Sequence, residues 1–176
     1  MTGRDVELRT ARLLLRAFRA TDVDDALAYR DDREFARFLP HIPQPFTRRD
    51  AEEFVARNMT EPWDTLPTFA VVLGGHVIGT VNLEIDHEAS TAMLGYALAR
   101  AHWGHGYATE AATAVLDWAR TEHHIAAFWA STALGNVRSR RVMEKLGMVL
   151  ARADDCDVRY WLHPTSSTIL LAPPDS

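Results

Sequence analysis

The sequence has a single cysteine, a single lysine and no long apolar run among its 176 residues. One cysteine, Cys156, cannot form an internal disulfide or a cysteine-based zinc site, and this favours a reducing compartment. Charged residues interrupt the first 20 positions, so no signal peptide is expected. Purely apolar runs such as residues 69–73 are far shorter than the ~20 residues that cross a bilayer. We therefore expect a cytoplasmic protein without a membrane span.

Excess charge of either sign is also small. The formal net charge is −5 and the isoelectric point is about 5.9, which argues against nucleic acid as a partner and weakly favours cationic amines. Hydrophobic residues at 47% and charged residues at 24% are typical of a globular protein. A chain of 176 residues predicts one domain spanning 1–176, and a monomer and a homodimer are both compatible with it.

The pattern of apolar residues predicts an α+β fold in which helices and strands are mixed. The clearest signal is a hairpin, in which β-rich runs at 68–73 and 76–85 flank Gly74 and Gly75. Apolar positions from Ala108 to Ala119 recur at helical spacing and predict a central helix. Further helices are expected over 21–35, 47–59 and 136–146, and further strands over 7–18, 91–99, 128–131, 148–151, 158–163 and 168–171.

Side chains along 76–85 should alternate between two faces of the sheet. One face would be apolar and would carry Val77, Val81, Leu83 and Ile85. The opposite face would be more polar and would carry Ile78, Thr80, Asn82 and Glu84. Glu84 is thus a candidate acid–base residue, and a solvated strand end is the alternative interpretation.

A glycine-containing turn, Trp103–Gly104–His105–Gly106–Tyr107–Ala108–Thr109, lies between an expected strand and the central helix. Small residues let backbone amides approach a ligand, and the amides and dipole of a helix N-terminus attract phosphate. Glycines also close loops for steric reasons alone. A dinucleotide fingerprint requires a third glycine where Thr109 stands, and a P-loop requires a Gly-Lys pair, whereas the single lysine is Lys145. Neither of these two motifs fits.

The segment from Trp103 to Ala108 resembles the signature of the GNAT superfamily of acyl-CoA-dependent N-acyltransferases: Arg or Gln, two residues, Gly, one residue, then Gly or Ala. Gly106 and Ala108 match, while Trp103 replaces the Arg or Gln, as in the branch that resembles the ribosomal-protein-alanine N-acetyltransferases (RimJ/RimL-like). Other segments are similar to that branch, and the resemblance covers about residues 7–150. The segments similar to that branch are 10–16, Ile78–Gly79, Gly95–Tyr96, Asn136-x-x-Ser139 and 144–148.

This resemblance implies a strongly bent, mixed and mostly antiparallel sheet flanked by about four helices. Its fourth and fifth strands would splay and admit the pantetheine arm of acetyl-CoA, the expected co-substrate. Backbone groups of Tyr96, Ala97 and Leu98 would pair with that arm. The diphosphate would lie on the turn formed by Trp103, Gly104, His105, Gly106, Tyr107, Ala108 and Thr109, with the Thr109 hydroxyl as an extra donor.

The implied reaction is direct attack of a primary amine, from a protein N-terminus or a small molecule, on the thioester. No enzyme nucleophile is required, so Cys156 has no expected role. Amines are largely protonated at neutral pH, so a base must take a proton. Glu84 is the first candidate, directly or through water, with Asp86 and His87 as rivals. Many members of the branch carry an acid just before the Gly-Tyr pair, where this chain has Met93–Leu94.

A proton donor for the leaving thiol is expected at the start of the 136–146 helix. Many superfamily members carry a tyrosine seven residues after the asparagine, where this chain has Met143, so Ser139 becomes the candidate. Asn136 would hold the pantetheine, although ordinary helix capping also explains an asparagine there. The arginines at 138, 140 and 141 would meet phosphates or form a solvated helix face.

The amine pocket should be formed by the first two helices, their loop and the C-terminal strands. Aromatic and histidine side chains in these segments are candidates to line it, although packing also explains them. They are Tyr29, Phe38, His41, Trp63, Tyr160 and Trp161. No metal is expected, because the pairs His102/His105 and His123/His124 lack a recognised ligand spacing. A non-catalytic acyl-CoA-binding sensor on the same fold is the rival to an enzyme.

Overall fold

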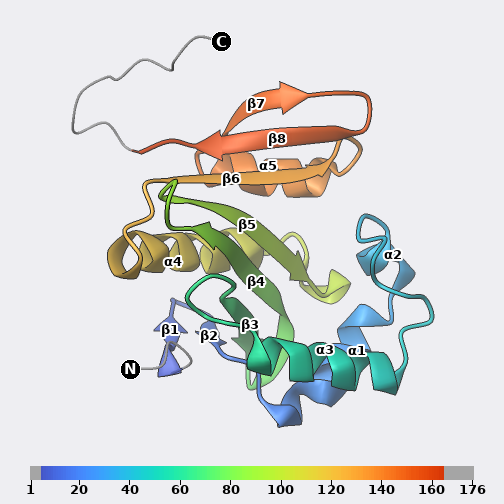
Figure 1. Ribbon diagram of the computed structural model, residues 1–176. Coiled ribbons are helices and arrows are strands. Elements are labelled where there is room, and N and C mark those ends of the chain that lie inside the picture. The colour runs from blue at the N-terminus through green and yellow to red at the C-terminus, as the bar shows by residue number, and fades with distance from the viewer. Residues whose placement is uncertain (1–4, 165–176) are drawn as a thin grey trace.

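The computed structural model describes residues 5–164, which form a mixed sheet with helices on both faces (Figure 1). Its eight strands lie in the order β1-β2-β3-β4-β5-β6-β8-β7. The strands are β1 (Leu8–Arg9), β2 (Leu14–Arg16), β3 (Thr68–Leu73), β4 (His76–Asp86), β5 (Thr91–Leu98), β6 (Ala127–Ala133), β7 (Val149–Ala153) and β8 (Asp157–Leu162). The helices are α1 (Val23–Arg30), α2 (Arg33–Ala36), α3 (Arg48–Thr60), α4 (Tyr107–Glu122) and α5 (Val137–Lys145), with 3-10 turns η2 (Ala20–Asp22) and η3 (Arg100–His102).

The β3–β4 hairpin and the β4–β5 pair are antiparallel, as the sequence predicts. Gly74 and Gly75 join β3 to β4 with φ values of 58° and 91°, in the region that glycine enters at least cost. The strand expected over 7–18 is shorter and divided, because Thr10 turns the chain between β1 and β2 through bonds to Leu13. The strand expected at 168–171 lies outside the described residues.

The one parallel junction within the described sheet is the short contact between β5 and β6. Thr91–Met93 pair with Ala127–Trp129, and beyond them the two strands diverge. On their outer sides β5 continues to pair with β4, and β6 continues to pair with β8. The fourth and fifth strands of the superfamily correspond to β5, which contains Gly95 and Tyr96, and β6. This arrangement confirms their expected splay, and the V-shaped opening between β5 and β6 is called the cleft below.

Two hydrophobic cores fill the two sides of the sheet. The α4-side core includes Phe69, Leu83, Leu116 and Phe128, all at most 2% exposed. The α1–α3 core includes Phe18 and Phe54, whose rings meet edge to face, on the opposite side. Figure 1 shows α4 behind β4 and β5, with α1 and α3 toward the viewer. Within residues 5–164 no helix is long and apolar enough to span a membrane.

The expected alternation along β4 is wrong at its start. A bulge shifts the register, so that Val71 pairs with Gly79 and Val72 pairs with Val77. Ile78 is therefore the extra residue, and it packs into the α4-side core, whereas Val77 packs into the α1–α3 core. A bulge places two residues opposite one and reverses the side-chain alternation beyond it. From Val81 onward the predicted faces are confirmed.

The helix expected over 21–35 is broken into α1 and α2. Its second part restarts because the Asp32 side chain accepts hydrogen bonds from the amides of Glu34 and Phe35, at 2.8 and 3.1 Å. Such a cap competes with continuation of the preceding helix. The described residues thus contain five α-helices, where about four were expected.

Candidate active site

The turn before α4 presents backbone amides rather than side chains. Gly104 and Gly106 both have φ near 80°, and no side chain caps the helix. The first backbone bond of α4 runs from the amide of Glu110 to the carbonyl of Gly106, at 3.0 Å. The amides of Tyr107, Ala108 and Thr109 precede that bond and have no acceptor within the helix. These amides and the helix dipole fit an anionic ligand such as a diphosphate.

Backbone groups also face the cleft from β5. The amide of Ala99 donates to the carbonyl of Ile78 at 2.7 Å, so it points toward β4. Because alternate residues of an antiparallel strand point their backbone groups to opposite sides, Tyr96 and Leu98 point theirs toward the cleft. Ala97 pairs with Thr80 and turns toward β4. We therefore retain Tyr96 and Leu98 as backbone partners for a pantetheine arm and correct the expectation for Ala97.

Trp103, the departure from the superfamily signature, connects the turn to both sides of the cleft. Its indole Nε1 donates to the carbonyl of Leu98 at 2.7 Å. The Arg138 guanidinium of α5 lies 4.8 Å from the centre of its ring. The Leu98 carbonyl is consequently occupied, and the Leu98 amide is the group left to face a ligand. His105 is exposed and stacks on Tyr107, with 5.7 Å between ring centres.

An ion-pair network that sequence reasoning missed braces this turn. Glu110 accepts from Arg12 Nε at 2.7 Å and from the Thr10 hydroxyl at 2.5 Å. Arg12 also donates to the carbonyl of His105 at 2.9 Å and lies 4.4 Å from the centre of the Tyr107 ring. Burial acts to raise the pKa of Glu110, but the bonds from Thr10 and Arg12 outweigh it and lower the pKa. The β1–β2 connection thereby fixes the turn.

We expect Glu110→Gln to weaken acetyl-CoA binding about tenfold while leaving kcat at saturation nearly unchanged, because a charge-assisted bond contributes roughly 1.5–3 kcal/mol before solvent screening. Titration calorimetry measures the Kd. Asp117→Asn is the matched control, since Asp117 forms an exposed ion pair with Arg120 at 2.9 Å on the same helix. Equal affinities of the two variants would show that the network does not position the turn.

A second pair of polar groups joins the two sides of the cleft. The Tyr96 hydroxyl, from β5, donates to the carbonyl of Ser139 at 2.8 Å and lies 2.9 Å from the Ser139 Oγ, in α5. Burial raises the pKa of Tyr96 to about 12, against the opposing effect of the Ser139 bond. The phenol therefore stays protonated at neutral pH. The sequence suggested Tyr96 for its backbone alone and gave no signal for this contact.

Asn136 caps α5, as one of its two interpretations predicts. Its Oδ1 accepts from the amide of Ser139 at 3.3 Å, and its Nδ2 donates to the Thr132 hydroxyl at 3.0 Å. Met143 is 1% exposed and belongs to the α4-side core. Ser139 thus lies in the first turn of a capped helix, with its hydroxyl fixed by Tyr96.

Residues 12–149 match the family described as "Acetyltransferase (GNAT) domain". The chain belongs to the GNAT acetyltransferase family. It is 30% identical over 145 residues to "Uncharacterized N-acetyltransferase YnaD" of Bacillus subtilis (strain 168), covering 81% of this chain and 82% of that protein. Both matches identify an acyltransferase enzyme.

Solved structures share the GNAT fold. The acetyltransferase (GNAT family) from Bacillus anthracis superimposes with a TM-score of 0.79 at 25% identity, covering 90% of this chain and 98% of that chain. Microcin C7 self immunity acetyltransferase MccE, solved in complex with acetyl-CoA and AMP, gives 0.77 at 16% identity, covering 88% and 93%. These structures confirm the fold class.

Glu84 lies beside the closed end of the GNAT cleft. It pairs with Met93, the last residue of β5 that still pairs with β6, and its side chain is exposed. Met93 pairs with Trp129 of β6, and Trp129 pairs with Trp161 of β8. Directly paired residues lie on the same face, so Glu84, Met93, Trp129 and Trp161 all lie on the face of the sheet opposite α4. The rival Asp86 accepts from the amide of Ala89, and His87 turns to Asp64. Of the three candidate bases, Glu84 therefore lies nearest the cleft.

The predicted amine-binding residues do not all come together. Tyr29 is 6% exposed, packs against Phe35 in the α1–α3 core, and burial raises its pKa to about 12. Trp63 is 5% exposed and packs against Phe69 and Trp118 in the α4-side core. It lies on the wrong side of the sheet for the expected pocket, because its large apolar ring is more stable in that aromatic cluster.

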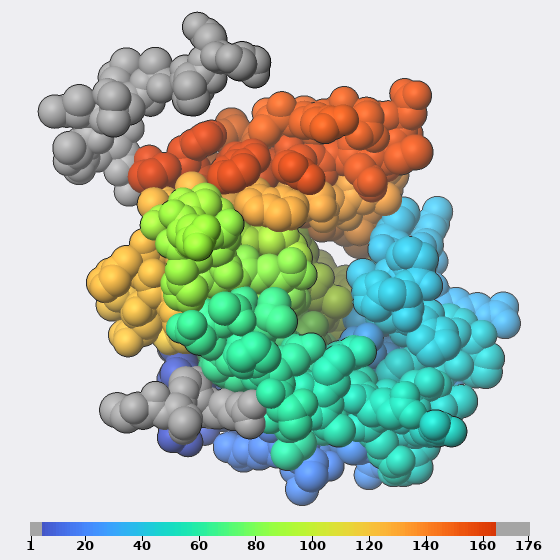
Figure 2. Space-filling model, viewed as in Figure 1, coloured from blue at the N-terminus to red at the C-terminus, as the bar shows by residue number. Residues whose placement is uncertain are grey.

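The remaining residues predicted for the amine pocket are Phe38, Trp161 and His41. Phe38 lies opposite the β6–α5 connection, since a Cβ built on Gly135 would come within 4.0 Å of its ring. Trp161 is partly exposed and stacks on His163. Desolvation, followed by the charges of Arg30 and Arg57, lowers the pKa of His41. Figure 2 shows a hollow between the segment around α2 and the β6–β8 half.

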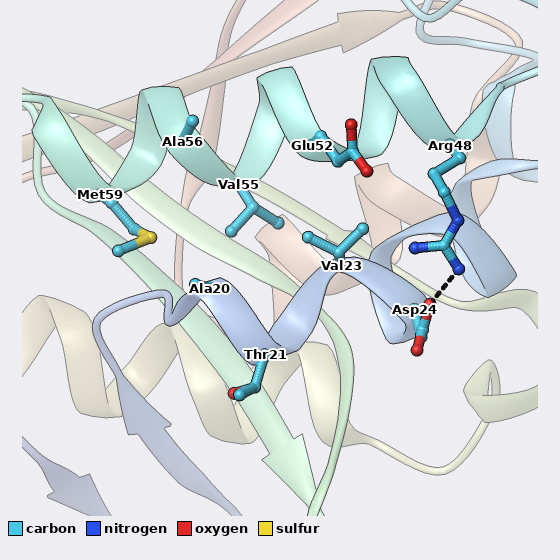
Figure 3. Close-up of a pocket in the computed structure, with 9 residues that line it drawn as sticks. All are labelled: Ala20, Thr21, Val23, Asp24, Arg48, Glu52, Val55, Ala56 and Met59. Carbon is cyan, nitrogen blue, oxygen red and sulfur yellow. Dashed lines mark hydrogen bonds and ion pairs between the residues drawn. The ribbon is translucent and has the colours of Figure 1, made fainter.

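Tyr160, which was also predicted to line the amine pocket, is buried instead. Tyr160 is 2% exposed, and its hydroxyl contacts Arg140 and Glu144, so it packs α5 onto β8. A groove of about 470 Å³ lies between α1 and α3 (Figure 3) and is crossed at one end by the Arg48–Asp24 ion pair. No residue predicted for acetyl-CoA or the amine is among those that line it.

Proposed function

We propose that this protein transfers the acetyl group of acetyl-CoA to a primary amine, either the α-amino group of a protein N-terminus or a small-molecule amine, as a RimJ/RimL-like N-acetyltransferase of the cytoplasm. The observation that carries the proposal is the cleft itself. The uncapped N-terminus of α4 stands at its open end, and the Tyr96–Ser139 hydroxyl pair joins its sides. Cys156 is exposed in the β7–β8 turn and has no part in the reaction.

The residues of the cleft supply each proton movement that direct transfer needs. Glu84, directly or through water, takes a proton from the ammonium so that the neutral nitrogen attacks the thioester carbonyl. The Leu98 amide supports the negative charge that develops on the carbonyl oxygen. As the carbon–sulfur bond breaks, Ser139 gives its hydroxyl proton to the thiolate and recovers one from Tyr96. The second proton, which the attacking nitrogen loses as the amide forms, passes through solvent to Tyr96, so that the phenol is neutral again. Asn136 keeps Ser139 in place by capping α5.

We expect Glu84→Gln to lower kcat/KM at least tenfold at pH 7, in line with the ~10²–10⁴-fold contribution of general bases, with an unchanged Kd for acetyl-CoA. The deficit should shrink as pH rises through the pKa of the amine, because the nucleophile is then already neutral. A pH–rate profile measures this. Glu88→Gln, in the exposed turn just beyond, is the control, and Asp86→Asn tests the rival. A deficit that is constant with pH would exclude Glu84 as the base.

Calorimetric titration with acetyl-CoA, with CoA and NADH as controls, tests the proposal first. Saturable acetyl-CoA binding, followed by thiol release with amines of one class, would support it. The amine panel should contain peptides with free α-amino groups and small polyamines. A folded protein that binds acetyl-CoA and turns over no amine would favour the sensor function instead. Absence of binding would overturn both.

A further inference from the structure

Three side chains that can ligate a metal ion meet at the end of the sheet away from the α4 N-terminus. Asp64 lies between α3 and β3, His87 in the β4–β5 turn and His123 at the end of α4. Their ligand atoms all lie within 4.8 Å of one another. His87 Nε2 is 3.4 Å from Asp64 Oδ2, and His123 Nδ1 is 4.0 Å from Asp64 Oδ1. None of the three has a place in the proposed acetyl transfer.

Packing and backbone contacts hold this cluster in shape. His87 Nε2 lies 2.9 Å from the backbone carbonyl of Asp64, a hydrogen bond that this nitrogen gives up when it binds an ion. The His123 side chain is 15% exposed, and its ring lies edge-on against Trp118 at 4.7 Å. The centres of the two imidazole rings are 5.8 Å apart. A histidine that is packed against a tryptophan and directed at a carboxylate loses little conformational freedom when it binds an ion.

We propose that Asp64, His87 and His123 bind one Zn²⁺ ion, which ties the three connections together. Two imidazole nitrogens and one carboxylate oxygen form a donor set that zinc accepts, with water in the fourth position. Tetrahedral bonds of ~2.0–2.1 Å place ligand atoms about 3.4 Å apart. His87 Nε2 already lies at this distance from Asp64 Oδ2, whereas His123 Nδ1 lies 4.0 Å from the other carboxylate oxygen. The three ligand atoms lie within 4.8 Å of one another, so side-chain rotations must bring them closer by up to about 1.4 Å when the ion binds.

A second histidine–carboxylate pair in the same chain provides the comparison. His76 Nδ1 lies 3.1 Å from Asp25 Oδ1 at the β3–β4 hairpin, and the Asp25 carboxylate also accepts from the amide of Val77. Among residues 5–164 no second histidine joins this pair, which is an ordinary surface contact. The third ligand therefore separates the proposed zinc site from a simple ion pair.

The test is a zinc titration of the full chain, free of any affinity tag and treated with chelator, by competition with a chromophoric chelator. We expect one equivalent to bind, a Tm that rises with zinc concentration, and visible absorption bands when Co²⁺ replaces Zn²⁺. His87→Ala and Asp64→Asn should each weaken binding at least tenfold, and His76→Ala should not. Thermal unfolding without metal confirms that each variant is folded.

Three outcomes would overturn the proposal. They are the absence of saturable binding, wild-type affinity in both His87→Ala and Asp64→Asn, and an equal loss of affinity in His76→Ala. Asp64→Asn preserves size and shape, so it keeps the test decisive even where an alanine variant unfolds. Acetyl-CoA binding is an independent readout that the zinc variants should leave unchanged.

Discussion

Gly106→Val is expected to raise the Kd for acetyl-CoA about 10- to 100-fold in a protein that still folds. Gly106 has φ near 80°, and a Cβ at this position would lie 3.6 Å from Arg12 Nη2. A β-branched residue at positive φ costs about 1–3 kcal/mol, which the turn relieves by changing conformation. That change redirects the amides of residues 107–109, which are the groups that we propose bind the diphosphate. Titration calorimetry measures the loss.

Gly75→Val is the matched control for this prediction. Gly75 has φ near 91° and open space around its Cβ, so valine introduces the same kind of backbone strain in the β3–β4 hairpin. Its Tm should fall about as much as that of Gly106→Val, while its acetyl-CoA affinity stays at the wild-type value. Retained affinity in Gly106→Val would rule out the α4 N-terminus as the diphosphate site.

Ser139→Ala is expected to lower kcat about 100-fold with little change in the Kd for acetyl-CoA, because a positioned proton donor contributes ~10²–10⁴-fold. The thiolate then leaves without a proton from the enzyme. Tyr96→Phe retains Ser139 but removes the group that resupplies it, so its kcat should fall less, about tenfold by the same principle. Steady-state thiol release measures both values.

Ser139→Cys separates a chemical role from a structural one. A thiol also carries a transferable proton, so this variant should recover part of the activity that alanine loses. The Tyr96 bond to the Ser139 backbone carbonyl persists in all of the position-139 variants, which keeps α5 in place. Equal kcat values for the alanine, cysteine and wild-type proteins would remove Ser139 from the mechanism.

The sequence predicts those parts of the structure that depend on near neighbours. The Gly74–Gly75 hairpin, the apolar stripe of α4 and the glycine turn each follow from a few consecutive residues, and all three are present. The break between α1 and α2 also has a local cause, since Asp32 is a good capping residue, but helical periodicity masks it.

The remaining features arise from contacts between distant segments. Arg12 and Glu110 are far apart in the chain, as are Tyr96 and Ser139, and no periodicity predicts that either pair meets. The bulge at Ile78 depends on how β3 and β4 pair, which the alternation of one strand does not reveal. Burial in a tertiary aromatic cluster likewise decided the position of Trp63.

The brief junction between β5 and β6 makes the sheet two mechanical units joined at a seam. One unit runs from β1 to β5, and the other contains β6, β8 and β7. Only three paired positions join these two units of the sheet, so the seam between them is a natural site of local unfolding. Acetyl-CoA lying in the cleft, as we propose, would supply the missing rungs and couple the two units. The sheet would then be less stable between the release of CoA and the binding of the next acetyl-CoA.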